Sequence, residues 1–207
     1  MQSNFLKKIP DIIARSAIKV LAIIIFVVLL VIVVIFIYCL KVYKINNSSS
    51  LDLAKAYSAF ANRNQQLGIA MLDEVIAKYP KTPAAYQAKL FRADMLMELQ
   101  FYDEALNILK ETESKAKPET IKPLALVRII YIYDSKKDYF NAITVSKKFI
   151  DKYPDHFLIR DIYLNLAEYY LGAGFKDEAV KTFNEVLISF PATQEAEKAQ
   201  KRINEIK

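Results

Sequence analysis

The chain has 207 residues with a formal net charge of +6 and a single cysteine, which excludes an intramolecular disulfide. Residues 1–50 hold six Lys or Arg and one Asp, whereas residues 51–207 hold 23 Lys or Arg and 22 Asp or Glu. The larger part is therefore nearly neutral and lacks the basic excess of a nucleic-acid-binding domain.

Residues 1–19 are expected to form a short tail in the cytoplasm, with Pro10 in the first turn of a helix that runs on into the next segment. That segment begins at Val20, ends at Leu40, and contains no charge, proline or glycine. As a helix rising about 1.5 Å per residue it would be roughly 31 Å long, which matches a hydrocarbon core of about 30 Å. Eighteen of its residues are Val, Ile, Leu or Phe, so insertion is favourable by on the order of 5 to 10 kcal/mol. We therefore predict that residues 20–40 cross a lipid bilayer.

A cleaved signal peptide and a lipoprotein signal were weighed against this anchor. A signal peptide has a shorter apolar core, about 7–15 residues, followed by small residues at the cleavage site, and residues 40–44 offer no such pattern. Cys39 follows Tyr38, whereas a lipoprotein signal would need a small residue there. The anchor is therefore preferred.

The orientation of the anchor rests on a small difference in charge. Four Lys or Arg precede the span, and Lys41, Lys44 and Lys55 follow it. The positive-inside rule favours a cytoplasmic N-terminus in a single-pass inner (cytoplasmic) membrane protein with a periplasmic or extracytoplasmic domain. The opposite orientation, with a domain facing the cytosol, stays open as the alternative.

Residues 41–50 end in Asn and Ser and are expected to form a polar linker, with Ser50 as the N-cap of the next helix. From Leu51 onward the pattern is helical, with prolines only between apolar segments. Small residues recur every 37 positions (Gly68, Ala105, Ala142, Ala179), which predicts four helix pairs.

These units resemble tetratricopeptide (TPR) repeats over residues 51–191. The fourth is the clearest, with Tyr163, Leu166, Ala167 and Tyr170 on one helix face, Ala179 where the paired helix approaches, and Pro191 after the second helix. The second unit departs from the pattern, because Lys89 and Arg92 occupy apolar positions unless the preceding turn is one residue longer. Residues 113–123 are expected to form the longest loop.

Residues 192–207 predict a terminal helix that caps the array, with Ala196, Ala199, Ile203 and Ile206 facing inward. The predicted fold class is therefore all-α: one N-terminal transmembrane helix, a TPR-like α-solenoid of about four helix pairs, and a capping helix. The layout is also similar to the YfgM-type ancillary subunit of the SecYEG translocon.

No catalytic constellation, cofactor motif or metal-ligand cluster stands out. The only histidine, His156, lies in a predicted loop without a second candidate ligand and is expected to be solvated. Acidic pairs such as Asp177 and Glu178 open helices, where the helix dipole favours negative charge. An enzyme, a cofactor and a small-molecule substrate are accordingly not expected.

The resemblance implies a concave face lined by the first helices of the repeats and suited to a protein partner. The groove positions it implies are Val127, Arg128, Tyr131, Asp134, Leu164, Asn165, Glu168 and Leu171. Only Asn165 fits the carboxylate-clamp version of the family, so capture of a C-terminal carboxylate is not expected. The layout makes translocon or envelope-assembly components the expected partners, with a cytosol-facing receptor or docking module as the alternative.

Overall fold

The computed structural model describes residues 9–206, and every regular element among them is a helix. The chain divides into two units, residues 1–48 and Ser49–Lys207, which are considered separately. Helix α2, Ile9–Ala61, contains all the described residues of the first unit and the first residues of the second. Pro10 lies in its first turn, as predicted.

Residues 41–50 are helical, so the predicted linker is wrong in conformation, and Ser50 does not cap a helix. Asn and Ser lower helix propensity by less than about 1 kcal/mol each, which flanking apolar segments can offset. Within the second unit, Ser49 and Leu53 on this helix are buried, and Leu53 and Ala56 belong to an apolar cluster with the next helices. Tertiary burial therefore outweighs the local preference for a linker.

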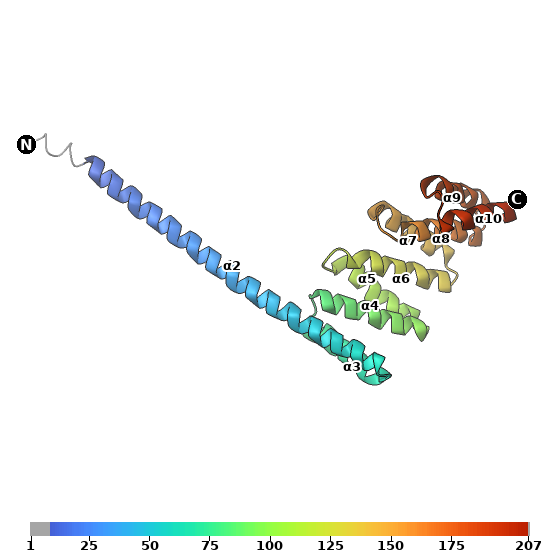
Figure 1. Ribbon diagram of the computed structural model, residues 1–207, viewed down its shortest axis with the longest axis horizontal. Helices are drawn as coiled ribbons and strands as arrows, with labels where there is room; N and C mark the ends of the chain where they lie inside the picture. Colours follow the sequence, from blue (N-terminus) through green and yellow to red (C-terminus); the bar gives the residue numbers. More distant parts are fainter. Residues whose placement is uncertain (1–8, 207) are drawn as a thin grey trace, which may run out of the picture. The chain divides into compact units, whose positions relative to one another are not determined.

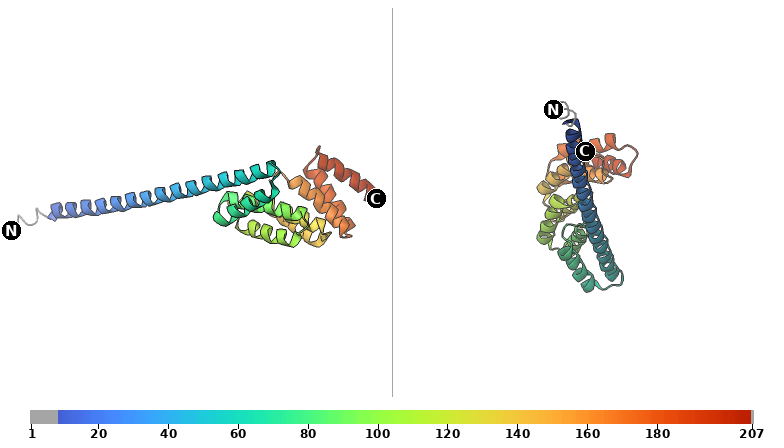
Figure 2. Two further views of the ribbon diagram at one scale, coloured as in Figure 1. Left: turned by 90° about the horizontal axis from the view of Figure 1, so that it is seen from below. Right: turned by 90° about the vertical axis from the view of Figure 1, so that its left-hand side faces the viewer.

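The second unit contains eight more helices that follow one another in chain order (Figures 1 and 2). Together with the last turns of α2, which pack against α3, they form four pairs and a final helix. Their bounds are α3 Gln65–Lys78, α4 Pro83–Glu98, α5 Tyr102–Lys115, α6 Ile121–Ser135, α7 Tyr139–Lys152, α8 Ile159–Gly172, α9 Lys176–Ser189 and α10 Gln194–Ile206. The predicted solenoid is confirmed, while the loop expected at residues 113–123 is only residues 116–120.

The turns inside the pairs repeat with the same period as the small residues. One residue in each turn has a positive φ, namely Arg63, Gln100, Lys137 and Gly174, at 60°, 62°, 56° and 85°. Side-chain oxygens of Asn64 and Asp138 then accept N–H bonds from the first turn of the following helix. One backbone geometry thus closes all four pairs, although only the fourth turn uses a glycine.

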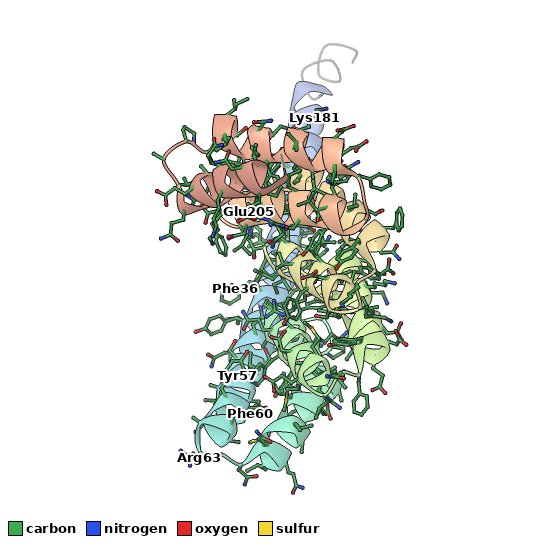
Figure 3. The ribbon with its side chains drawn as sticks, turned by 90° about the vertical axis from the view of Figure 1, so that its right-hand side faces the viewer. Phe36, Tyr57, Phe60, Arg63, Lys181 and Glu205 are labelled. Carbon is green, nitrogen blue, oxygen red and sulfur yellow. The ribbon has the colours of Figure 1, made fainter. Side chains whose placement is uncertain are left out.

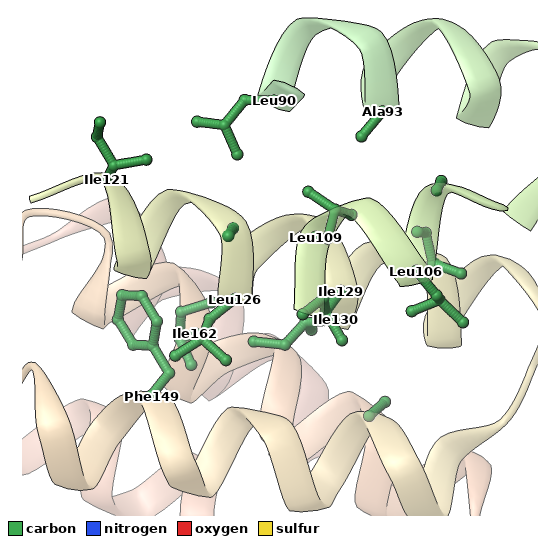
Figure 4. Close-up of a cluster of buried hydrophobic side chains, with 14 of the residues drawn as sticks. Leu90, Ala93, Leu106, Leu109, Ile121, Leu126, Ile129, Ile130, Phe149 and Ile162 are labelled. Atoms are coloured by element: carbon green, nitrogen blue, oxygen red, sulfur yellow. The ribbon is translucent and has the colours of Figure 1, made fainter. Parts of the chain in front are cut away.

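The small residues recurring every 37 positions are buried where paired helices meet. Ala105, Ala142 and Ala179 have no exposed surface, and a Cβ added to Gly68 would lie 2.6 Å from the ring of Phe60. The largest apolar cluster joins α4 through α8, and Phe149 of α7 lies beside Leu126 of α6 within it (Figure 4). These contacts make the array continuous through its middle.

In the third repeat, two neighbouring buried positions of the second helix have a small and then a large side chain, the reverse of the order in the first and fourth repeats. Leu72, Leu109 and Phe183 share one repeat position and are fully buried, whereas the third repeat has Ser146 there. The next inward position is Val75 in the first repeat and Val186 in the fourth, but Phe149 in the third. The third repeat thus combines a small side chain at the first position with a large one at the second, and the Ser146 hydroxyl has no hydrogen-bond partner among the described residues.

The second repeat accommodates its two basic residues without abandoning the core. Ala88 is fully buried, and Phe91 packs against the apolar cluster that contains Leu53 and Ala56. This is the arrangement predicted if the turn before α4 is one residue longer. Lys89 is also buried, with its ammonium 3.1 Å from Glu111 and 5.5 Å from the ring of Tyr86. The ion pair and the aromatic face therefore offset the cost of burying the lysine charge, so the position does not require an apolar residue.

Helix α10 closes the C-terminal end of the array. Ala196, Ala199 and Ile203 are buried, and Ile206 packs beside them at the edge of the last cluster, as the predicted cap requires. Thr193 accepts an N–H bond from Ala196 and so caps the first turn of this helix.

Candidate protein-binding face

The first helices of the pairs, with α10, line one side of the second unit, which we call the first-helix face. Residues 34 positions apart meet across successive first helices on this face. Figure 3 marks Tyr57 on α2, whose ring centroid lies 5.3 Å from that of Phe91 on α4 in an edge-on arrangement. The same 34-residue spacing defines one pair of positions at each step along the face.

Two of these steps are bidentate ion pairs. Asp94 on α4 accepts two hydrogen bonds from Arg128 on α6, at 2.6 and 2.8 Å. Glu168 on α8 accepts two from Arg202 on α10, again at 2.6 and 2.8 Å. Hydrogen bonds to Glu168 and then Glu205 raise the pKa of Arg202. The planar guanidinium matches a carboxylate at both oxygens, so each pair sets the register between two helices.

The step between α6 and α8 has no such pair. The equivalent residues are Tyr131, which is 59% exposed, and Asn165, which is also exposed, and no hydrogen bond or ion pair among the described residues joins them. The backbones of α6 and α8 approach each other less closely than those of α4 and α6 or of α8 and α10. The connection before α8, residues 153–158, is also the longest between pairs.

Asp134 lies one turn beyond Tyr131 and is half-buried. The equivalent residues of the other repeats are Phe60, Met97 and Leu171, each packed against an apolar cluster. Burial raises the pKa of the Asp134 carboxyl, and no cation among the described residues pairs with it. An acid thus occupies a position that the rest of the array gives to apolar side chains.

An apolar cavity of about 470 Å³ lies at the other end of α6. It is lined by Glu119, Thr120, Pro123, Leu124, Tyr153, His156 and Phe157. The Phe157 ring is 69% exposed, and the His156 ring stacks against it at 4.5 Å. His156 is half-buried, accepts an N–H bond from Leu158, and has its pKa lowered by burial, so the expectation of a solvated histidine is wrong.

The eight groove positions expected from the sequence divide into three groups. Arg128 and Glu168 are engaged in ion pairs, while Tyr131 and Asn165 are free on the surface. The rest are packed to different degrees: Val127, Asp134 and Leu171 are half-buried, whereas Leu164 is buried in the last cluster with only its edge beside a depression next to Asn165.

Asp94, Arg202 and the cavity residues other than His156 were not among the residues singled out from the sequence. The 37-residue period contained a usable signal, because Asp94, Tyr131 and Glu168 are equivalent, as are Arg128, Asn165 and Arg202. Applying the period to charged residues would have located the ion pairs and the interruption between them.

The described residues contain no group of three or more His, Cys, Asp or Glu side chains placed to hold a metal ion. Polar groups on the first-helix face are instead spread along five helices, and free aromatic, amide and carboxylate groups lie between paired charges. Such a face is suited to holding an extended or helical protein segment.

The sequence profile of the tetratricopeptide repeat-like domain family matches residues 22–158. The chain belongs to this family. The match includes most of the apolar segment of α2 and the first three helix pairs of the TPR-like array. No curated protein matches the chain in sequence.

Solved structures agree on the TPR fold. A tetratricopeptide repeat protein from Parabacteroides merdae has a TM-score of 0.64 and 14% identity over 77% of this chain, which covers 60% of that protein. The TPR-like repeats of a putative kinesin light chain from Podospora anserina have a TM-score of 0.58 and 14% identity, covering 76% of this chain and 84% of that one. At these identities the likeness concerns the fold alone.

Proposed function

We propose that this protein is a membrane-anchored TPR scaffold that binds a protein partner through its first-helix face. The TPR fold is typical of protein–protein interaction. The proposal extends that role to a domain on the extracytoplasmic side of the cytoplasmic membrane, serving secretion or envelope assembly.

The observation that carries the anchor is the surface of α2 in the first unit. Its large apolar side chains from Leu21 to Leu40 are 48% to 67% exposed, and no charged residue interrupts this stretch. A soluble monomer rarely exposes a contiguous apolar surface of more than a few hundred Å². This is the one described helix long and apolar enough to cross a membrane, and the family match begins within it.

The orientation is tested by protease treatment of intact spheroplasts. Four basic residues precede the span and three follow it, so the positive-inside rule favours an extracytoplasmic domain. Degradation of residues 51–207 by the added protease would support this orientation. Protection that is lost only after permeabilisation would favour the second candidate, a cytosol-facing docking module, which the same small difference of charge supports.

The binding face is tested by photo-crosslinking in cells. A photoreactive amino acid at Asn165 on the first-helix face should crosslink to a partner, while the same group at Ile188 on α9, which is 79% exposed, serves as the matched control. Crosslinking at Ile188 but not at Asn165 would contradict the proposed face. Affinity purification in mild detergent then identifies the partner, and recovery of no translocon or envelope component would contradict the secretion role.

A further inference from the structure

The interruption in the first-helix face between α6 and α8 combines three departures from the repeat. Tyr131 and Asn165 stand where two of the other steps have an acid and an arginine, and where the first step has the ring pair of Tyr57 and Phe91. Asp134 stands where the other three repeats have a large apolar residue. We call these three residues the open rung. All three residues lie on two successive first helices, α6 and α8.

Asp134 is the least favourable of the three for the folded protein. Its carboxylate is partly removed from water and has no ion-pair or hydrogen-bond partner among the described residues, which costs free energy in the charged state. Leucine occurs at the equivalent position of the fourth repeat, so an apolar side chain is compatible with the site. Residues that reduce stability in this way are expected where a protein binds a ligand.

The apolar cavity at the start of α6 lies on the same side of this helix as Tyr131, because Leu124, which lines the cavity, precedes Tyr131 by seven residues or nearly two full turns. Leu124 lines the cavity, and Asp134 lies ten residues further along the helix, which is about 15 Å at 1.5 Å per residue. In an extended chain rising about 3.3 Å per residue, two side chains four positions apart are separated by about 13 Å and point to the same side, whereas side chains five positions apart point to opposite sides. The spacing between cavity and carboxylate therefore predicts the spacing between two side chains of a ligand.

We propose that the open rung and the apolar cavity together bind an extended segment of the partner protein that carries a Lys or Arg four residues from a large apolar side chain. This inference rests on the proposed function and adds the chemistry of the partner. The basic side chain pairs with Asp134 and lies over the ring of Tyr131, and the apolar side chain enters the cavity between Leu124 and Phe157.

Each group contributes a different interaction. The partly desolvated carboxylate gains more from a cation than an exposed one does, because solvent screens the pair less. The exposed tyrosine ring offers a face for the same cation. The Asn165 amide can both donate to and accept from the backbone of an extended segment. The neighbouring ion pairs, Asp94 with Arg128 and Glu168 with Arg202, leave Asp134 as the unneutralised charge between them.

The test uses the full-length chain in detergent micelles and nine-residue fluorescent peptides of Ser and Gly. Each peptide contains one Phe and one Lys, separated by two, four or five positions, and a matched peptide has Glu in place of Lys. Binding is measured by fluorescence anisotropy for the unaltered protein, Asp134→Asn, and Asp161→Asn. Asp161 is the control, because it is an exposed aspartate on the first-helix face outside the open rung.

We expect binding of the Lys peptide with a spacing of four, and weaker binding of the Glu peptide and of the Lys peptides with spacings of two and five. Asp134→Asn should reduce affinity about tenfold or more, as expected for the loss of a charge-assisted hydrogen bond, while Asp161→Asn should not. Asp134→Asn should also raise the melting temperature, so lost binding cannot be ascribed to unfolding.

Absence of peptide binding, or equal binding by Asp134→Asn, would overturn this inference. The proposed function is judged separately by crosslinking at Asn165, which can succeed even if the partner segment has another chemistry. An Asp134-dependent dimer of the full-length chain in light scattering would identify the occupant as a second copy and would also overturn the inference.

Discussion

Replacement of Ser146 by alanine should stabilise the protein. Ser146 is fully buried on α7, and its hydroxyl has no hydrogen-bond partner within the described part of the chain. A buried unsatisfied hydroxyl costs about 1–3 kcal/mol. Removing the oxygen leaves a cavity of one atom, which costs a few tenths of a kcal/mol at about 24 cal/mol per Å³. The net expected gain is about 1–2 kcal/mol, and alanine also has the higher helix propensity.

The assay is thermal unfolding of residues 49–207, followed by circular dichroism. For a domain of this size, 1 kcal/mol changes the melting temperature by about 2–4 °C, so an increase of about 2–8 °C is expected. The matched control is Thr112→Val on α5, another fully buried hydroxyl. Its Oγ1 donates to the carbonyl of Ile108 at 2.8 Å, so its removal should leave the melting temperature unchanged or lower it.

The sign of the difference decides between two explanations of Ser146. If Ser146→Ala lowers the melting temperature, the hydroxyl is hydrogen-bonded in solution, and the size exchange with Phe149 does not leave a polar group unsatisfied. An increase of equal size in Thr112→Val would show that any buried hydroxyl in these helices is unfavourable, which would also refute the reasoning.

Four further predictions follow from the fold. Ala179→Leu should lower the melting temperature by several degrees, since overpacking costs about 1–3 kcal/mol, whereas Lys181→Leu at an exposed position should change it little; equal effects would contradict the repeat register. Gln100→Gly should raise stability by up to about 1 kcal/mol in urea unfolding, because φ is 62° at this turn; a decrease would indicate that the turn relaxes in solution. Hydrogen bonds from Lys55 and then Tyr79 lower the pKa of Asp52 from 3.8 to about 2. The Asp52 carboxylate therefore stabilises the fold above pH 3.8, and this stabilisation is lost as the pH falls through about 2. Asp52→Asn should destabilise the protein at pH 6 and have no effect near pH 1.5. Residues 49–207 alone should be soluble and strongly helical by circular dichroism, and a need for detergent would contradict the division into two units.

Local sequence patterns determined most of the fold. The uncharged stretch from Val20 to Leu40 predicts a long apolar helix because its composition needs no tertiary context to be recognised. The recurrence of small residues every 37 positions predicts four helix pairs, since each marks a point where two helices must approach closely. The capping helix follows from its own 3.6-residue periodicity.

Tertiary structure decided how side chains of different helices meet. Lys89 departs from the repeat pattern in the sequence, and only the tertiary structure shows that it forms an ion pair with Glu111 on the next helix. Asp94 and Arg128 are 34 residues apart, and only the packing of α4 against α6 brings them within 2.6 Å. The same holds for what is missing at Tyr131 and for the burial of Asp134: desolvation depends on the depth and register of neighbouring helices, which no single helix encodes.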